Sequence, residues 1–143
     1  MKSIISKGIL INVDSEQTNQ IYQNPDFSVC DCSYCINFYK TIEKNAPVEL
    51  ITLLKQLGIE ILKPSEAVEY GRLDDKNLYI VDYHFIGSFN EKSQTQTTLD
   101  TTNFDYDFYL NDRSLASKLF DNYNIVALSV SILLPWVLDE KHE

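Results

Sequence analysis

The chain has 143 residues, of which 21 are Asp or Glu and 12 are Lys or Arg, so its formal net charge is −9. Apolar residues make up 44 %, which is enough for a globular core, and four glycines and four prolines are too few for a fibrous or disordered chain. Because nucleic acids and anionic membranes are bound through Lys and Arg, the acidic balance argues against both as partners.

The first half of the chain is predicted to hold one strand followed by three helices. Residues 4–13 alternate at period two as a single strand, with Ile5 on the same face as the later apolar residues. Apolar residues at spacings of three and four then predict helices over 15–23, 33–44 and 47–57. Ser15 and Ser33 are the expected N-caps of the first two helices, and Gly58 is the expected C-cap of the third.

The second half changes to the alternation typical of antiparallel strands with one buried face. Strands are predicted over 68–73, 78–87, 103–110 and 125–134. A hairpin turn is expected at 74–77, a polar connection at 91–103, and a short helix or a strand end at 114–120.

These elements predict an α+β fold in which the N-terminal strand and the helices pack on one face of a four- or five-stranded antiparallel sheet. We expect a single domain over 1–143, with a helical part at about 14–66 and a strand-rich part at about 67–138.

The acidic charge is concentrated in the strand-rich half. Residues 1–65 hold seven acidic and six basic residues, whereas residues 66–143 hold fourteen and six, a net charge of −8. Such asymmetry fits either simple solubility or a face that docks a basic partner protein. The start of the chain lacks the long apolar core of an export signal, and the uncharged stretch 124–138 is shorter than the ~20 residues of a membrane helix. The sequence therefore predicts a cytoplasmic protein with reduced thiols.

The three cysteines form the most chemically specific motif, C-x-C-x-x-C, at Cys30, Cys32 and Cys35. Three thiolates this close in sequence predict a site for a soft metal such as zinc, which usually takes four ligands. The two histidines are His84 and His142, and His142 lies in a charged tail. His84 is therefore the candidate fourth ligand, provided that its face of the strand meets the cysteine segment.

Two other interpretations of the cysteines stay open. Cys32 and Cys35 form a C-x-x-C pair beside an expected helix start, where the pKa of a thiol is lowered, as thiol-redox chemistry requires. The loop expected before them does not provide the βαβ context of a thioredoxin-like site. Alternatively the thiols only pack, since free cysteines are among the most buried residues.

No other pattern in the sequence marks a catalytic centre. Asp82, Asp105 and Asp107 would form a carboxylate row if their strands were neighbours, but the alternation favours a solvated sheet face as their explanation. His84 lies two residues after Asp82, on the same strand face, with no nucleophile marked nearby. The sequence has neither a nucleophile-elbow motif nor a glycine-rich phosphate loop, so it favours a non-catalytic protein.

Four landmarks carry a resemblance that spans most of the chain: 22–27, the C-x-C-x-x-C-x-N-F segment 30–38, 57–59 together with 63–64, and the C-terminal 134–138 with its P-W-V-L. The chain resembles a family of small bacterial proteins that share these landmarks. That resemblance implies a single bacterial domain and draws attention to the cysteine segment, but it implies no activity and no catalytic residue.

The sequence thus leads to two main hypotheses. The first is a small acidic protein of the inhibitor, immunity or modulator type that binds a basic partner protein through electrostatic steering. The second is a metal-binding domain built on Cys30, Cys32, Cys35 and His84. A thiol-redox protein is a third and weaker hypothesis.

Overall fold

The structure of the protein is a computed structural model that describes residues 1–73, 75–89, 104–110, 113 and 116–138. The described elements, in chain order, are β1 (Lys2–Ser6), β2 (Ile9–Val13), α1 (Ser15–Gln23), α2 (Ser33–Asn45), α3 (Val48–Leu57), β3 (Glu66–Leu73), β4 (Lys76–Phe89), β5 (Phe104–Leu110), the 3-10 turn η2 (Lys118–Phe120) and β6 (Ile125–Leu134). The connection expected at 91–103 lies outside the described residues. None of the described helices combines the length and apolar character that a membrane crossing requires.

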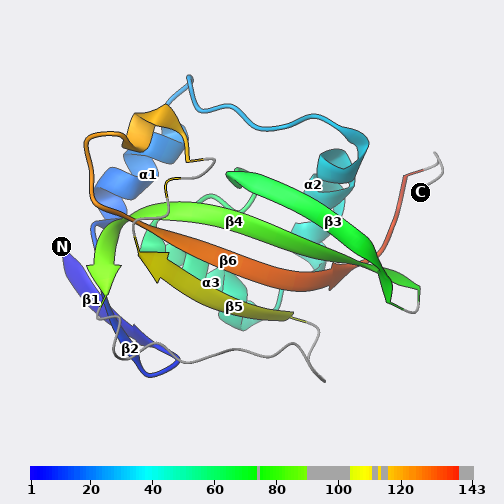
Figure 1. Ribbon diagram of the computed structural model, residues 1–143, viewed down its shortest axis with the longest axis horizontal. Helices are drawn as coiled ribbons and strands as arrows, with labels where there is room; N and C mark the ends of the chain where they lie inside the picture. Colours follow the sequence, from blue (N-terminus) through cyan, green and yellow to red (C-terminus); the bar gives the residue numbers. More distant parts are fainter. Residues whose placement is uncertain (74, 90–103, 111–112, 114–115, 139–143) are drawn as a thin grey trace.

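One six-stranded antiparallel sheet forms the centre of the fold (Figure 1). Its strand order is β1-β2-β4-β6-β5, and β3 pairs with β4 off this path. The α+β class and the antiparallel sheet are therefore confirmed, with one strand more than the upper estimate from the sequence. Figure 1 shows α3 behind the sheet and α1 and α2 beyond its upper edge.

The additional strand arises because residues 4–13 form a hairpin and not one continuous strand. Lys7 and Gly8 adopt positive φ angles of 54° and 74°, which suits the tight turn of a two-residue hairpin. The turn folds β1 back on β2, so that Ile5 pairs with Leu10. Ile5 is consequently 75 % exposed, and the prediction that it shares a buried face with Ile9 was wrong.

The buried face of the sheet is the aromatic face that the alternation predicted. Tyr79 and Phe85 are fully buried on β4, and the register places them on the same side as Phe108 of β5. The hydroxyl of Tyr83 reaches across and donates to the carbonyl of Ile61 at 2.7 Å. Burial of these large side chains between sheet and helices gives the fold its main stabilisation.

Helix α1 covers the edge of β4 between the segment that pairs with β3 and the segment that pairs with β2, while β6 pairs along the other edge. Pairing with β3 ends at Asp82, and pairing with β2 starts at Gly87. Between them, Tyr22 Oη donates to the carbonyl of His84 at 2.7 Å and accepts from its N–H at 3.2 Å. Thr18 Oγ1 accepts from the N–H of Ile86 at 3.0 Å. Side chains of a helix thus replace the missing ladder and keep the buried backbone groups satisfied.

The junction between α3 and α1 depends on Gly58. Gly58 has φ of 81° and caps α3 through its N–H, as the sequence predicted. A Cβ atom at this position would lie 2.2 Å from the backbone oxygen of Ser15, so the residue also permits close contact between the helices. The N-cap of α1 is Asp14, whose carboxylate accepts from the N–H of Gln17 at 3.1 Å; the assignment of Ser15 to that role was wrong.

Candidate functional site

The three cysteines lie together at the start of α2, and all three are free thiols. Their sulfur atoms are all within 4.8 Å of one another. Cys30 and Cys32 are exposed, whereas Cys35 is buried. The group is therefore open to solvent on one side and anchored in the core on the other.

Backbone contacts hold the cysteine loop in place. The N–H of Cys32 donates to the sulfur of Cys30 at 3.4 Å, and Tyr39 Oη, one turn after Cys35, donates to the carbonyl of Cys30 at 2.6 Å. The thiol of Cys35 points to the carbonyl of Ala67 on β3 at 3.8 Å. Helix α2 begins at Ser33 with Cys32 as its N-cap, so the expectation that Ser33 is the cap was wrong by one residue.

The two thiols of the C-x-x-C pair differ in acidity. Burial by itself would raise the pKa of Cys32, but hydrogen bonds from the backbone of Cys35 and Tyr34 and from the neighbouring thiols outweigh it and lower that pKa. Burial raises the pKa of Cys35, and the neighbouring thiols raise it further. Cys32 is therefore the thiol of this pair that becomes a nucleophile or a metal ligand first.

The spacing of the three sulfur atoms suits a thiolate-bound metal ion. Zinc–sulfur bonds of about 2.3 Å in a tetrahedral arrangement separate the sulfur atoms by about 3.8 Å. The described cysteines lie within 4.8 Å of one another, so small rotations of the side chains would complete such a geometry. The three cysteines can therefore hold a metal ion.

His84 does not join the cysteines, contrary to the sequence-based expectation of a fourth ligand. Among the described residues the metal-ligating group consists of Cys30, Cys32 and Cys35. His84 is 1 % exposed, and its Nδ1 atom lies 2.6 Å from Ser65 Oγ. Its ring also packs against Phe120 of η2, with 6.2 Å between the ring centroids. The other histidine, His142, lies outside the described residues.

The carboxylates form a row across the sheet that contains two of the three expected members, Asp82 and Asp107. Glu66 pairs with Asp82, Asp82 with Ser129, and Ser129 with Asp107, so the row crosses β3, β4, β6 and β5. Asp105 lies in the next row and forms an ion pair with Lys7. The sequence missed Glu66 because only the β3–β4 register brings it opposite Asp82.

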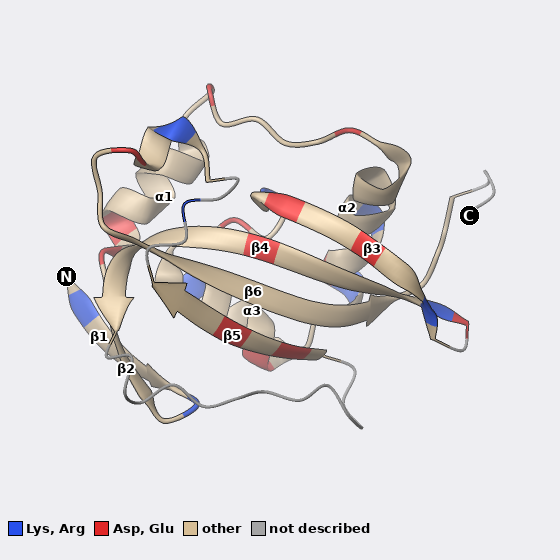
Figure 2. Ribbon diagram, in the orientation of Figure 1, with Lys and Arg blue, Asp and Glu red and all other residues tan. Residues whose placement is uncertain are grey.

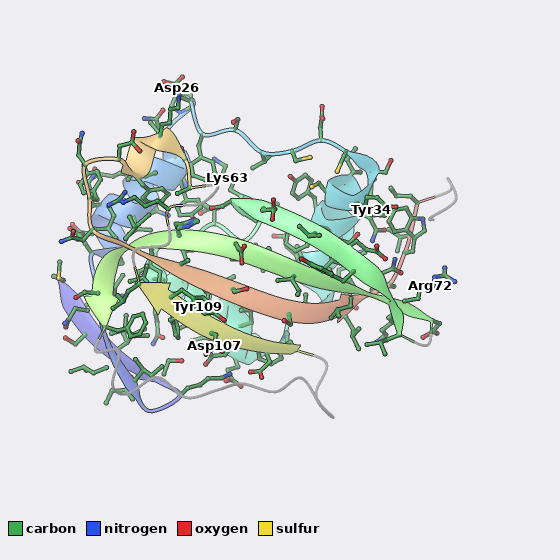
Figure 3. The ribbon with its side chains drawn as sticks, in the orientation of Figure 1. Asp26, Tyr34, Lys63, Arg72, Asp107 and Tyr109 are labelled. Atoms are coloured by element: carbon green, nitrogen blue, oxygen red, sulfur yellow. The ribbon has the colours of Figure 1, made fainter. Side chains whose placement is uncertain are left out.

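The acidic row lies on the sheet face opposite the buried aromatic side chains. Figure 2 shows acidic residues along β3, β4 and β5, and Figure 3 labels Asp107 and Tyr109 on β5. The basic residues within β3, β4, β5 and β6 are Arg72 and Lys76, beside the β3–β4 turn. This face of the sheet therefore presents negative charge from β3, β4 and β5, with serines of β6 between β4 and β5.

The structure also brings together Ser65 and His84, a pair that no sequence motif signals. Ser65 precedes β3, and its N–H donates to the carbonyl of Asp82 at 2.7 Å, which places its side chain beside His84. The same serine lines a surface cavity of about 610 Å³ between the loop after α1 and η2. Only the alignment of β3 with β4 makes these two residues neighbours.

Comparisons of the chain with protein-family models, with curated proteins and with solved structures found no match.

Proposed function

We propose that the protein binds a thiophilic metal ion, with zinc as the expected metal, through Cys30, Cys32 and Cys35. The observation that carries this proposal is the mutual approach of the three sulfur atoms to within 4.8 Å. The lowered pKa of Cys32 adds to it, because a metal binds the thiolate and competes with the proton. A water molecule or a further donor would complete the tetrahedral coordination.

The exposure of the thiols favours this proposal over purely structural cysteines. Cysteines that only pack are usually buried, and burial here applies to Cys35 but not to Cys30 or Cys32. A disulfide between two of the three would bring one pair to about 2.05 Å and leave the third thiol without a role. A site of reduced thiols also fits the cytoplasmic compartment that the sequence predicts.

Metal analysis and thiol titration on one sample test the proposal. Protein purified under reducing conditions without chelator should contain about one equivalent of zinc and release it to a strong chelator. Cys32→Ser should lose the metal, while Ser33→Ala, the matched change at the next residue, should keep it. Metal-free protein with three freely reacting thiols would refute the proposal, and loss of two thiols to a disulfide would favour the redox hypothesis.

A second candidate function is the binding of a basic protein partner by the acidic row. Like charges directly opposite each other on neighbouring strands are destabilising, and Glu66 lies opposite Asp82. A basic partner would relieve that repulsion and would be attracted by the net charge of the strand-rich half. This interpretation corresponds to an inhibitor, immunity or modulator protein.

Charge removal at the row tests the second function. The triple variant Glu66→Gln/Asp82→Asn/Asp107→Asn should lose a basic protein that the wild type captures at low salt. The control Glu16→Gln/Glu43→Gln/Glu49→Gln removes the same charge from exposed positions on the three α-helices and should retain it. Equal capture by both variants would exclude the acidic row as the binding surface.

A further inference from the structure

The contact between Ser65 and His84 has the geometry of a nucleophile beside its base. Ser65 Oγ and His84 Nδ1 are 2.6 Å apart, within the range in which an imidazole can accept a hydroxyl proton. In the tautomer that carries its proton on Nε2, the unprotonated Nδ1 atom accepts the hydrogen bond from the hydroxyl of Ser65. The metal proposal does not use this pair, although Cys30 lines the same cavity as Ser65.

The histidine of this pair is held rigidly. Tyr22 binds both the N–H and the carbonyl of His84, so the backbone is fixed on the strand edge. The imidazole packs against Phe120, and His84 is 1 % exposed. A base whose position is set by its surroundings stays aligned with its nucleophile, which is what acid–base catalysis requires.

The serine of this pair faces a cavity of a size that takes small ligands. Ser65 lines the space of about 610 Å³, and ligand pockets usually have volumes of about 300–1,000 Å³. Phe27 and Leu119 provide apolar wall, and Lys118 is the one basic residue among the described lining residues. Asp26, labelled in Figure 3, belongs to the loop that forms one wall.

We propose that Ser65 and His84 form a catalytic pair that hydrolyses a small carboxylic ester bound in this cavity. Ser65 Oγ attacks the acyl carbon while its proton passes to His84 Nδ1. The bond from the acyl carbon to the alcohol oxygen breaks, and the alcohol leaves with the proton from His84. Water then attacks the acyl-serine, gives its proton to His84, and releases the carboxylic acid as Ser65 regains its proton. Lys118 provides positive charge in the cavity for the oxyanion that forms in each half of the reaction.

The first experiment is covalent labelling of the intact protein with a fluorophosphonate probe. We expect one adduct, mapped to Ser65 by peptide mass spectrometry, and its loss in Ser65→Ala. Ser88→Ala removes an exposed serine elsewhere on the strand of His84 and should leave the labelling unchanged. Absence of an adduct on wild-type protein, or an adduct that persists in Ser65→Ala, would overturn the proposal.

The second experiment is hydrolysis of p-nitrophenyl acetate. The wild-type rate should exceed that of Ser65→Ala by at least about 100-fold, the usual contribution of a positioned base and its nucleophile. The fluorescence of Trp136, the single tryptophan, reports whether the variant is folded. Ser65 is half-buried, and its change to alanine removes only the hydroxyl, so we expect the variant to fold. A folded Ser65→Ala with the wild-type rate would refute the assignment. Metal analysis of the same samples separates the two proposals, because Ser65→Ala removes no cysteine and should keep its metal whether or not the esterase activity is lost.

Discussion

The side chain of Asn37 on α2 accepts a hydrogen bond from the backbone N–H of Val137, 100 residues further along the chain, at 2.8 Å. Its Nδ2 atom donates to the carbonyl of Pro135 at 3.0 Å, so Asn37 binds the chain on both sides of Trp136. Trp136 in turn packs edge-on against Tyr34, with 5.7 Å between the ring centroids. Two landmarks that stand far apart in the sequence, the asparagine after the cysteines and the C-terminal P-W-V-L, therefore form one contact beside the cysteine group.

Replacement of Asn37 by leucine should destabilise the protein by about 2–4 kcal/mol. Asn37 is fully buried, and the change leaves the N–H of Val137 and the carbonyl of Pro135 without this partner. Urea unfolding followed by Trp136 fluorescence measures the loss. Asn45→Ala, at the exposed end of the same helix, should cost less than about 1 kcal/mol, and equal losses for both variants would contradict the role of Asn37.

Tyr22→Phe tests whether α1 serves as the edge partner of β4. The variant keeps the ring and removes only the hydroxyl that bonds the N–H and carbonyl of His84. Two buried backbone groups then lose this partner, and we expect a loss of about 1–3 kcal/mol in the free energy of unfolding. The control Tyr70→Phe changes a residue that is 63 % exposed and should be neutral within about 0.5 kcal/mol.

Alanine substitutions at two glycines with similar φ angles distinguish the free-energy cost of steric crowding from that of a strained backbone conformation. Gly8 and Gly58 have φ of 74° and 81°, but a Cβ atom at Gly8 would meet nothing within 4 Å. Gly8→Ala should therefore cost only the left-handed conformation, about 1–2 kcal/mol. Gly58→Ala adds a collision with the backbone of Ser15 and should cost clearly more in a thermal or urea unfolding measurement. Equal costs would show that α1 and α3 can move apart freely.

Much of the secondary structure follows from local patterns. The strands β4, β5 and β6 were predictable because each buries one face, which imposes alternation on residues such as Tyr79, Phe108 and Val130. The N-terminal hairpin could not be predicted from the sequence, because the alternation of apolar residues continues through Lys7 and Gly8. Only the positive φ angles of these two residues reveal the turn. The position of β6 between β4 and β5 depends on long-range pairing, which no local pattern encodes.

The candidate sites likewise differ in whether local sequence or long-range strand pairing brings their residues together. Cys30, Cys32 and Cys35 lie within six residues, so local geometry alone brings them together. Ser65 and His84 are 19 residues apart and meet through strand register. His84 was expected to approach the cysteines because its strand face could have met them; in the structure the aromatic face meets the helices, and His84 points the other way.

Alkylation of both cysteines should rise with pH, but the midpoints for Cys32 and Cys35 should be shifted in opposite directions from the ordinary thiol pKa. The pKa of Cys32 lies below its ordinary value of 9.0 and that of Cys35 lies above it. In the folded, metal-free protein, iodoacetamide should modify Cys32 at lower pH than Cys35, and the difference should vanish in urea. Site-resolved mass spectrometry measures both rates. Identical pH profiles in the folded protein would contradict the assigned environments.

The lowered pKa of Cys32 also predicts how this thiol affects the free energy of unfolding at different pH. Because its pKa is lower in the folded chain than in the unfolded one, its deprotonation favours folding. That contribution is fully present above the ordinary pKa of 9.0 and is lost as the pH falls through the folded-state value. Cys32→Ser should remove this part of the pH dependence, seen by comparing urea midpoints of the metal-free proteins across the alkaline and neutral range.

Titration of the reduced, metal-free protein with Co²⁺ tests the central claim most directly, because cobalt–thiolate bonds give a charge-transfer absorption in the near ultraviolet. We predict a band that rises to saturation at one equivalent, disappears on addition of Zn²⁺, and is absent from Cys32→Ser but present in Ser33→Ala. A reduced, folded protein that develops no such band would contradict the assignment of Cys30, Cys32 and Cys35 as a metal site.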